Sequence, residues 1–182
     1  MHKPEPETHR GRLLVATPDL TDPNFAETVI LLLEHSAAGA LGVVLNRPSE
    51  VGLDDALPDW AGHAADPAVV FVGGPVQPNA VIGLAHALSP PAEAWEEIGP
   101  GVGVVDLASD AAVTTVTAVR VFAGYAGWAP DQLEAEVAEG AWFIVDAEPG
   151  DGFAPEPDQL WSRVLRRQGG VFVAATPDPS RN

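Results

Sequence analysis

Four polar residues in the first third of the chain have the types and the spacing to bind an anion. Asp22 and Glu27 flank a Pro-Asn-Phe-Ala segment, and Asn46 and Arg47 follow the apolar runs that come next. An arginine guanidinium is a planar fork of N–H donors that matches a carboxylate or a phosphate. These residues are a candidate ligand-binding site, and an enzyme acting on a small anionic substrate would use Asn46, Arg47 and a carboxylate such as Glu27.

Arg47 stands out because basic side chains are scarce. The chain has 26 acidic side chains against 9 Lys and Arg, and between residues 13 and 162 only Arg47 and Arg120 are basic. Arg47 is either a counter-ion for nearby Asp22 or Glu27, or the anchor of a bound anion. The first alternative is structural and the second is functional, and the sequence leaves both open.

Two further motifs also have a structural and a functional interpretation. Gly73 and Gly74 could expose successive backbone N–H groups to an anion, although a glycine pair at a strand end more often makes a turn. His35 beside Glu34 could be an acid–base pair, but neighbours in a strand point to opposite faces, which favours an ordinary polar strand end. Gly73 and Gly74 are kept among the candidate ligand-binding residues.

An expected β-hairpin positions these residues. Residues 28–33 are β-branched or apolar on both alternating sets, which is typical of a central strand covered on both faces. Residues 40–45 resume the pattern after a short glycine-bearing loop. The hairpin should place Asn46 and Arg47 at its open end, roughly 20 Å from its turn at about 3.3 Å per residue.

The segment opposite that open end is expected to be helical. Asp22 is a suitable N-cap, and Pro23 suits the first helical position. A small polar cluster of residues 22–27 with Asn46 and Arg47 is therefore expected.

The rest of the chain predicts a mixture of strands and helices. Apolar, β-branched runs predict strands at residues 12–16, 68–72, 80–84, 102–107, 120–125 and 141–147. Amphipathic spacing with proline or glycine boundaries predicts helices at residues 91–98, 130–139 and 158–168, and a single helical turn at 53–57. Residues 109–117 are ambiguous, because threonine and valine favour a strand while Ser109 or Asp110 could cap a helix.

The common catalytic motifs are absent from the sequence. There is no Gly-x-Ser-x-Gly elbow, no Walker-type phosphate loop, no His-Glu-x-x-His and no dinucleotide fingerprint after a strand. The chain has no cysteine, which excludes a thiolate nucleophile and a zinc–thiolate site, and we expect no metal and no cofactor. Trp128, Trp142 and Trp161 occur at strand and helix spacing and are expected in the core rather than around a ligand.

Composition favours one ordinary globular domain. The 182 residues are 46% hydrophobic, so we expect a single domain over residues 10–182 after a disordered tail at 1–9. The formal charge of −17 disfavours direct nucleic-acid binding. The first ten residues lack the apolar core of a signal peptide, and no run is long enough to span a bilayer. We therefore expect a cytoplasmic protein with no membrane association.

Several motifs occur together in a fixed order. They are ATPDL, DPNF, TVILLLEH and GALGVVLNRP within residues 11–48, VGGPV at 72–76, GYAGW at 124–128 with Gln132-Leu133-Glu134, Trp142, and Leu160-Trp161 with Leu165-Arg166-Arg167. In this combination the chain resembles the AlgH/YqgE family of bacterial proteins almost end to end. Asp131 departs from the pattern, since the family usually has glycine there. The resemblance implies a helix over residues 109–117, and the family name implies a regulatory role in exopolysaccharide expression.

Residue patterns and resemblance agree on an α+β fold. We expect a mostly antiparallel or mixed, barrel-like sheet with helices packed outside it. The leading functional hypothesis is a regulatory or binding protein that acts through a small ligand, an anionic one in particular, or through a protein partner. The alternative is an enzyme that acts on a small anionic substrate near Asn46 and Arg47.

Overall fold

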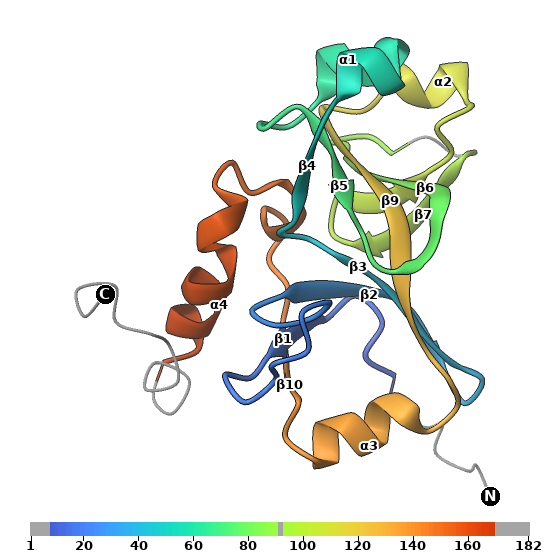
Figure 1. Ribbon diagram of the computed structural model, residues 1–182. Coiled ribbons are helices and arrows are strands. Elements are labelled where there is room, and N and C mark those ends of the chain that lie inside the picture. Colours follow the sequence, from blue (N-terminus) through green and yellow to red (C-terminus); the bar gives the residue numbers. More distant parts are fainter. Residues whose placement is uncertain (1–7, 91–92, 170–182) are drawn as a thin grey trace, which may run out of the picture.

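Ten strands of the computed structural model, which describes residues 8–90 and 93–169, form one strongly curved sheet (Figure 1). Its path is β10-β1-β2-β3-β9-β6-β8-β7, and β5 joins β4 to β9. Neighbouring strands are antiparallel except for β5 and β9, which are parallel. The strands are β1 (Leu13–Ala16), β2 (Val29–Ser36), β3 (Gly39–Val44), β4 (Pro48–Gly52), β5 (Val69–Val72), β6 (Val76–His86), β7 (Trp95–Gly99), β8 (Val102–Val105), β9 (Ala118–Trp128) and β10 (Trp142–Val145).

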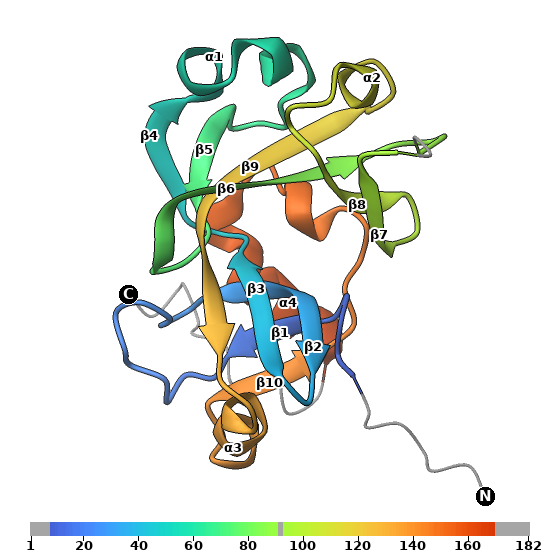
Figure 2. The ribbon, with the colours of Figure 1, turned by 90° about the vertical axis from the view of Figure 1, so that its right-hand side faces the viewer.

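The long strand β9 divides the sheet into two halves (Figure 2). Its C-terminal end pairs with β3, which belongs to the half made by β10, β1, β2 and β3. Its remaining length pairs with β6 and β5, which belong to the half made by β4 to β8. The sheet is therefore a half-barrel whose two halves face each other across an apolar interior, as expected for the predicted α+β fold.

Short helices pack around this sheet, and the last of them buries its apolar face in the interior core. They are α1 (Leu53–Ala56), α2 (Asp110–Val113), α3 (Gln132–Ala138) and α4 (Leu160–Gln168), with 3₁₀ turns at η1 (Pro58–His63), η2 (Asp151–Phe153) and η3 (Pro157–Gln159). In Figure 1, α1 and α2 lie at one end of the molecule, α3 lies at the other, and α4 runs along the side. The predicted helices at 53–57, 130–139 and 158–168 are thus confirmed. The helix that the resemblance implies over 109–117 is present as the single turn α2, which Ser109 caps by accepting the Ala112 N–H at 3.2 Å.

The β2–β3 hairpin confirms the prediction of a central strand. In β2, Val29 and Leu31 pack into the interior between the two halves of the sheet. Ile30 and Leu32 alternate with them and pack into a second core on the outer face, together with Leu133 of α3. Because both faces are covered, both alternating sets must be apolar, as the sequence shows.

Two predicted helices are wrong. Residues 91–98 include β7, an edge strand that pairs with β8, while residues 91–92 lie outside the described part of the chain. The pairing with β8 overrides a weak local helix preference. The segment after Asp22 makes one turn, in which Ala26 N–H bonds to the Asp22 carbonyl, and it stops at Glu27 because that residue has φ of 57°. In the described residues, no helix is long and apolar enough to cross a membrane.

Candidate functional site

Asn46 and Arg47 lie beside the turn that follows Asp22, as predicted. Arg47 Nη1 donates to the Asn24 carbonyl, and Nη2 donates to Pro23 O at 2.9 Å and Ala26 O at 3.3 Å. Asn46 accepts the Val29 N–H at 3.1 Å and donates to Glu27 O at 2.9 Å. Both side chains therefore close the open end of the hairpin by satisfying backbone groups.

Arg47 is not directly paired with the carboxylates that the sequence offers as its counter-ions. Within the described residues, Arg47 forms no ion pair with Asp22 or Glu27, and Asp22 instead accepts the Asn24 N–H at 2.9 Å. Partial burial lowers the pKa of Arg47, and the nearby charge of Asp22 opposes that shift. Much of the guanidinium is committed to carbonyl oxygens, so the geometry favours the structural alternative, and ligand binding by Asp22, Glu27, Asn46 and Arg47 stays a prediction.

Gly73 and Gly74 lie where β5 ends, close to the backbone of β9. The Gly73 N–H donates to Ala123 O at 2.8 Å, so it does not face a ligand. A Cβ at Gly73 would lie 2.3 Å from Gly124 O, and one at Gly74 would lie 2.1 Å from the Tyr125 carbonyl carbon. Both glycines are thus required for close packing of this connection against β9.

His35 finds a carboxylate partner other than its neighbour Glu34. Its Nε2 lies 2.7 Å from Glu134 Oε1 of α3, and its Nδ1 accepts the His9 N–H at 2.9 Å. Since Nδ1 accepts a hydrogen bond, Nε2 carries the ring N–H and donates a hydrogen bond to Glu134. This hydrogen bond lowers the pKa of Glu134, and the arrangement ties α3 and the N-terminal segment to β2. His9 is therefore held in place, and residues 1–7 of the expected tail lie outside the described part of the chain.

The interior of the half-barrel contains a cavity of about 280 Å³. Aliphatic side chains from both halves of the sheet and from the β7–β8 turn form its walls: Leu13, Leu31, Leu45, Leu84, Ile98 and Val102. Leu13 and Leu31 are paired neighbours on β1 and β2, and Leu84 of β6 belongs to the same buried cluster. The cavity is therefore built by the same alternation that builds the core.

Two arginines line the mouth of this cavity. Arg10 donates through Nε to Leu33 O at 3.1 Å and through Nη2 to Glu96 Oε1 and Glu97 O, both at 3.0 Å. Arg12 donates through Nε to Asp146 Oδ1 at 3.2 Å. Arg10 thereby links β2 to the edge strand β7, and Arg12 links β1 to the segment that follows β10.

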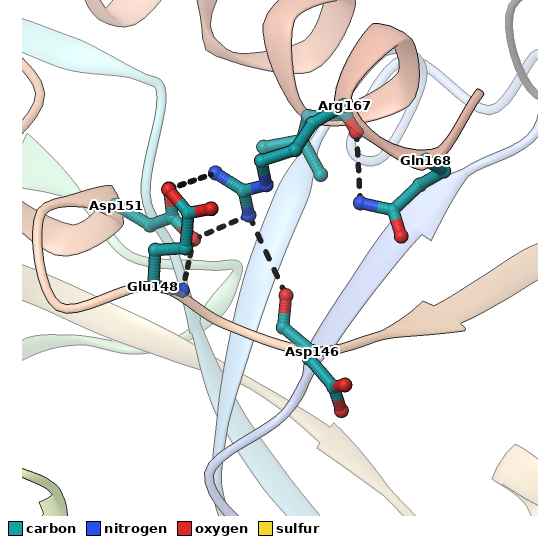
Figure 3. A network of polar contacts seen from close by, with 6 residues as sticks. Asp146, Glu148, Asp151, Arg167 and Gln168 are labelled. Atoms are coloured by element: carbon teal, nitrogen blue, oxygen red, sulfur yellow. Dashed lines mark hydrogen bonds and ion pairs between the residues drawn. The ribbon is translucent and has the colours of Figure 1, made fainter.

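A tighter ion pair anchors the segment that contains Asp146 (Figure 3). Arg167 of α4 binds Asp151 with both terminal nitrogens, each at 2.8 Å, and also contacts Glu148 at 3.1 Å. Asp151 accepts the Glu148 N–H at 2.7 Å as well. The bonds to Asp151 raise the pKa of Arg167, and they hold the 146–152 segment against α4.

Behind the cavity wall, Arg120 is almost completely buried. Its terminal nitrogens donate to Ala154 O at 3.0 Å, Gly152 O at 3.3 Å and Asp66 O at 2.6 Å, and its guanidinium lies 4.3 Å from the centre of the Phe71 ring. Burial lowers the pKa of Arg120 to about 10. Arg120 is the β9 partner of Leu84, so it supports the strand and the loop that form one wall of the cavity.

Sequence reasoning missed the cavity and its mouth. Arg10 and Arg12 carried a usable signal, because they are two arginines at i and i+2 immediately before the first strand of a chain poor in basic residues. Their acidic partners are distant in sequence, and nothing local identifies those partners. Trp128, Trp142 and Trp161 lie in the core, as predicted, rather than around the cavity.

Comparisons with known proteins agree on one family. The model of the AlgH-like family (DUF179) matches residues 13–173. A UPF0301 protein of Streptomyces coelicolor is 50% identical over 185 residues, with 94% of each chain covered, and one of Thermobifida fusca is 44% identical over 189 residues, again with 94% of each covered.

Solved structures agree with the sequence relatives. A crystal structure of a Corynebacterium diphtheriae protein is similar at a TM-score of 0.87 with 31% identity, covering 97% of this chain and 94% of that one. The solution structure of the AlgH protein from Pseudomonas aeruginosa is similar at a TM-score of 0.69 with 31% identity, covering 98% and 99%. The chain therefore belongs to the AlgH-like family.

Proposed function

We propose that this protein binds a small, mainly apolar molecule in the interior of its half-barrel and acts as a regulatory binding protein. The observation that carries the proposal is the open-mouthed cavity of about 280 Å³ whose inner walls are aliphatic side chains of both halves of the sheet. Ligand sites are typically concave, mostly apolar and supplied with a few polar groups at fixed positions. Arg10 and Arg12 supply such groups at the mouth.

The cavity's size limits its ligand. With roughly 30 Å³ for each water-sized group, it holds about nine or ten non-hydrogen atoms. Its volume is slightly below the range of about 300–1,000 Å³ that is usual for ligand pockets. A short aliphatic or compact aromatic molecule fits this description, whereas a nucleotide does not.

Regulation would follow from where the cavity lies. A ligand between the two halves of the sheet would contact β1, β2, β6 and the β7–β8 turn at once, and so would stabilise one relative arrangement of those elements. A protein partner that recognises this arrangement would sense the ligand. With a net charge of −17, the chain is better suited to a protein partner in the cytoplasm than to direct contact with DNA.

The alternative, an enzyme at Asn46 and Arg47, has less support. Both side chains are bonded to backbone groups of the hairpin and its neighbouring turn. A catalytic site would need a positioned base and a reacting group within hydrogen-bond reach. In this cluster the side chains of Asn46 and Arg47 instead hydrogen-bond to backbone groups at the open end of the hairpin.

A glycine substitution tests the proposal. Gly99 lines the cavity and pairs with Val102, and a Cβ added there meets nothing within 4 Å. Gly99→Leu should fill the cavity without a clash. Exposed Gly62, where a Cβ also meets nothing within 4 Å, provides the matched control Gly62→Leu.

The measurement is the thermal shift with 1-hexanol and 1-octanol. We expect both alcohols to raise the Tm of wild type and of Gly62→Leu, and to have a much smaller effect on Gly99→Leu. Equal responses in all three proteins, or no response in wild type, would contradict the proposal.

A further inference from the structure

Arg10 and Arg12 hold carboxylates at the mouth of the cavity through weak, exchangeable contacts. Each arginine side chain is about one-third exposed, whereas its partner is far more open: the Glu96 side chain is 63% exposed and the Asp146 side chain is 91% exposed. Ion pairs of such exposure contribute little to stability. By contrast, Asp151 is 7% exposed and is held by both terminal nitrogens of Arg167.

Arg10 keeps its position even without Glu96. Its Nε and Nη2 also donate to the carbonyls of Leu33 and Glu97, which belong to β2 and β7. The guanidinium is therefore oriented by backbone groups of two strands, and the side chain of Glu96 can leave without releasing it. A donor group fixed in advance loses little entropy when it takes a new partner.

We propose that the ligand of this cavity is an aliphatic monocarboxylate, whose tail occupies the interior and whose carboxylate displaces Glu96 and Asp146 from Arg10 and Arg12. This inference rests on the proposed function, and it adds the chemical class of the ligand. The internal acids show that the mouth accepts carboxylates at hydrogen-bond distance, and the aliphatic walls match a hydrocarbon tail.

The surrounding charges favour a single negative charge. Asp146, Glu148 and Asp151 all line the cavity, and Arg167 pairs with the last two. A dianionic phosphate would experience more repulsion from these carboxylates than a monoanion would. The cavity's capacity of about nine or ten non-hydrogen atoms corresponds to a chain the length of octanoate.

Calorimetric titration of the full chain tests the proposal, with octanoate, 1-octanol and octyl phosphate as probes. We expect octanoate to bind more tightly than either of the others. In Arg10→Gln/Arg12→Gln, octanoate affinity should fall at least about tenfold, because hydrogen bonds between charged partners are lost, while 1-octanol affinity should stay within about twofold. Arg163→Gln, which removes an exposed arginine of α4 outside the cavity, should change neither affinity.

A second variant keeps both arginines and removes their internal competitors. Glu96→Gln/Asp146→Asn should strengthen octanoate binding several-fold and leave 1-octanol unchanged, an effect that a purely structural role of these ion pairs would not produce. Because this variant keeps both arginines, it still tests the proposal if Arg10→Gln/Arg12→Gln fails to fold.

The failures of the two proposals are distinguishable. If 1-octanol binds as tightly as octanoate, if octyl phosphate binds more tightly, or if the acid-removing variant fails to strengthen octanoate binding, the carboxylate proposal is overturned and the apolar cavity stands. If none of the three probes binds, both proposals are overturned.

Discussion

Replacing Arg47 by methionine separates its structural role from a ligand-binding one. The variant keeps the aliphatic length of the side chain and removes donors to three carbonyls, those of Pro23, Asn24 and Ala26. These contacts are exposed or partly buried, so water replaces part of each, and the net loss should be well below the sum of three buried bonds. We expect Arg47→Met to lower the free energy of unfolding by about 2 kcal/mol.

The assay is urea unfolding combined with thermal melting. For a chain of this size, 2 kcal/mol corresponds to a decrease in Tm of about 4–8 °C. Arg47→Lys should lose most of the same stability, because a single ammonium cannot reproduce a fork that spans several carbonyls. Arg163→Met removes an exposed ion pair 3.5 Å long and should stay within about 0.5 kcal/mol of wild type.

Ligand response completes the test. If Arg47 is structural, the Tm increase caused by octanoate should persist in Arg47→Met. A variant with unchanged or increased stability that no longer responds to an anionic ligand would refute this reasoning and restore the anion site at Asn46 and Arg47.

Three further outcomes are expected. Arg120→Met should cost about 3–5 kcal/mol in chemical denaturation because it orphans buried carbonyls, whereas Arg166→Met, at an exposed position, should be nearly neutral. Because the folded-state pKa of Glu134 is lowered, this carboxylate contributes to the free energy of unfolding above about pH 4.3, and the contribution is lost as pH falls through the folded value. In unfolding experiments at several pH values, Glu134→Gln should therefore weaken the acid dependence of stability, whereas Glu139→Gln, at an exposed position, should not. No specific DNA complex tighter than micromolar should form near physiological salt, and a salt-sensitive specific complex in a titration would contradict that.

Local signals were enough to predict most of the framework. Apolar runs on both alternating sets identify β2, and the short loop fixes the register that brings Asn46 and Arg47 to the turn after Asp22. Proline and glycine boundaries identify α3 and α4. The sequence predicts a helix at the edge strand β7 because the acidic residues of this strand carry no alternation that would show its pairing with β8.

The mouth of the cavity could not be predicted in the same way. Arg10 and Glu96 are 86 residues apart in sequence, and Arg12 and Asp146 are 134 apart, so only the tertiary fold brings them together. The same holds for His35 and Glu134, which are 99 residues apart. In the sequence, the aliphatic residues of the cavity wall have the pattern of ordinary core residues. Whether a core is filled or hollow depends on side-chain packing, which the spacing of apolar residues does not determine.

Methyl NMR of the full chain titrated with octanoate tests the central claim most directly. If the ligand enters the half-barrel, the methyl resonances of Leu13, Leu31 and Leu84 should shift in a saturable manner and show intermolecular contacts with the octanoate tail. Val81 and Leu107 line a separate, open hollow on the outside of the sheet and should stay unchanged. Shifts confined to Val81 and Leu107, or no saturable shift at the three interior leucines, would contradict the account.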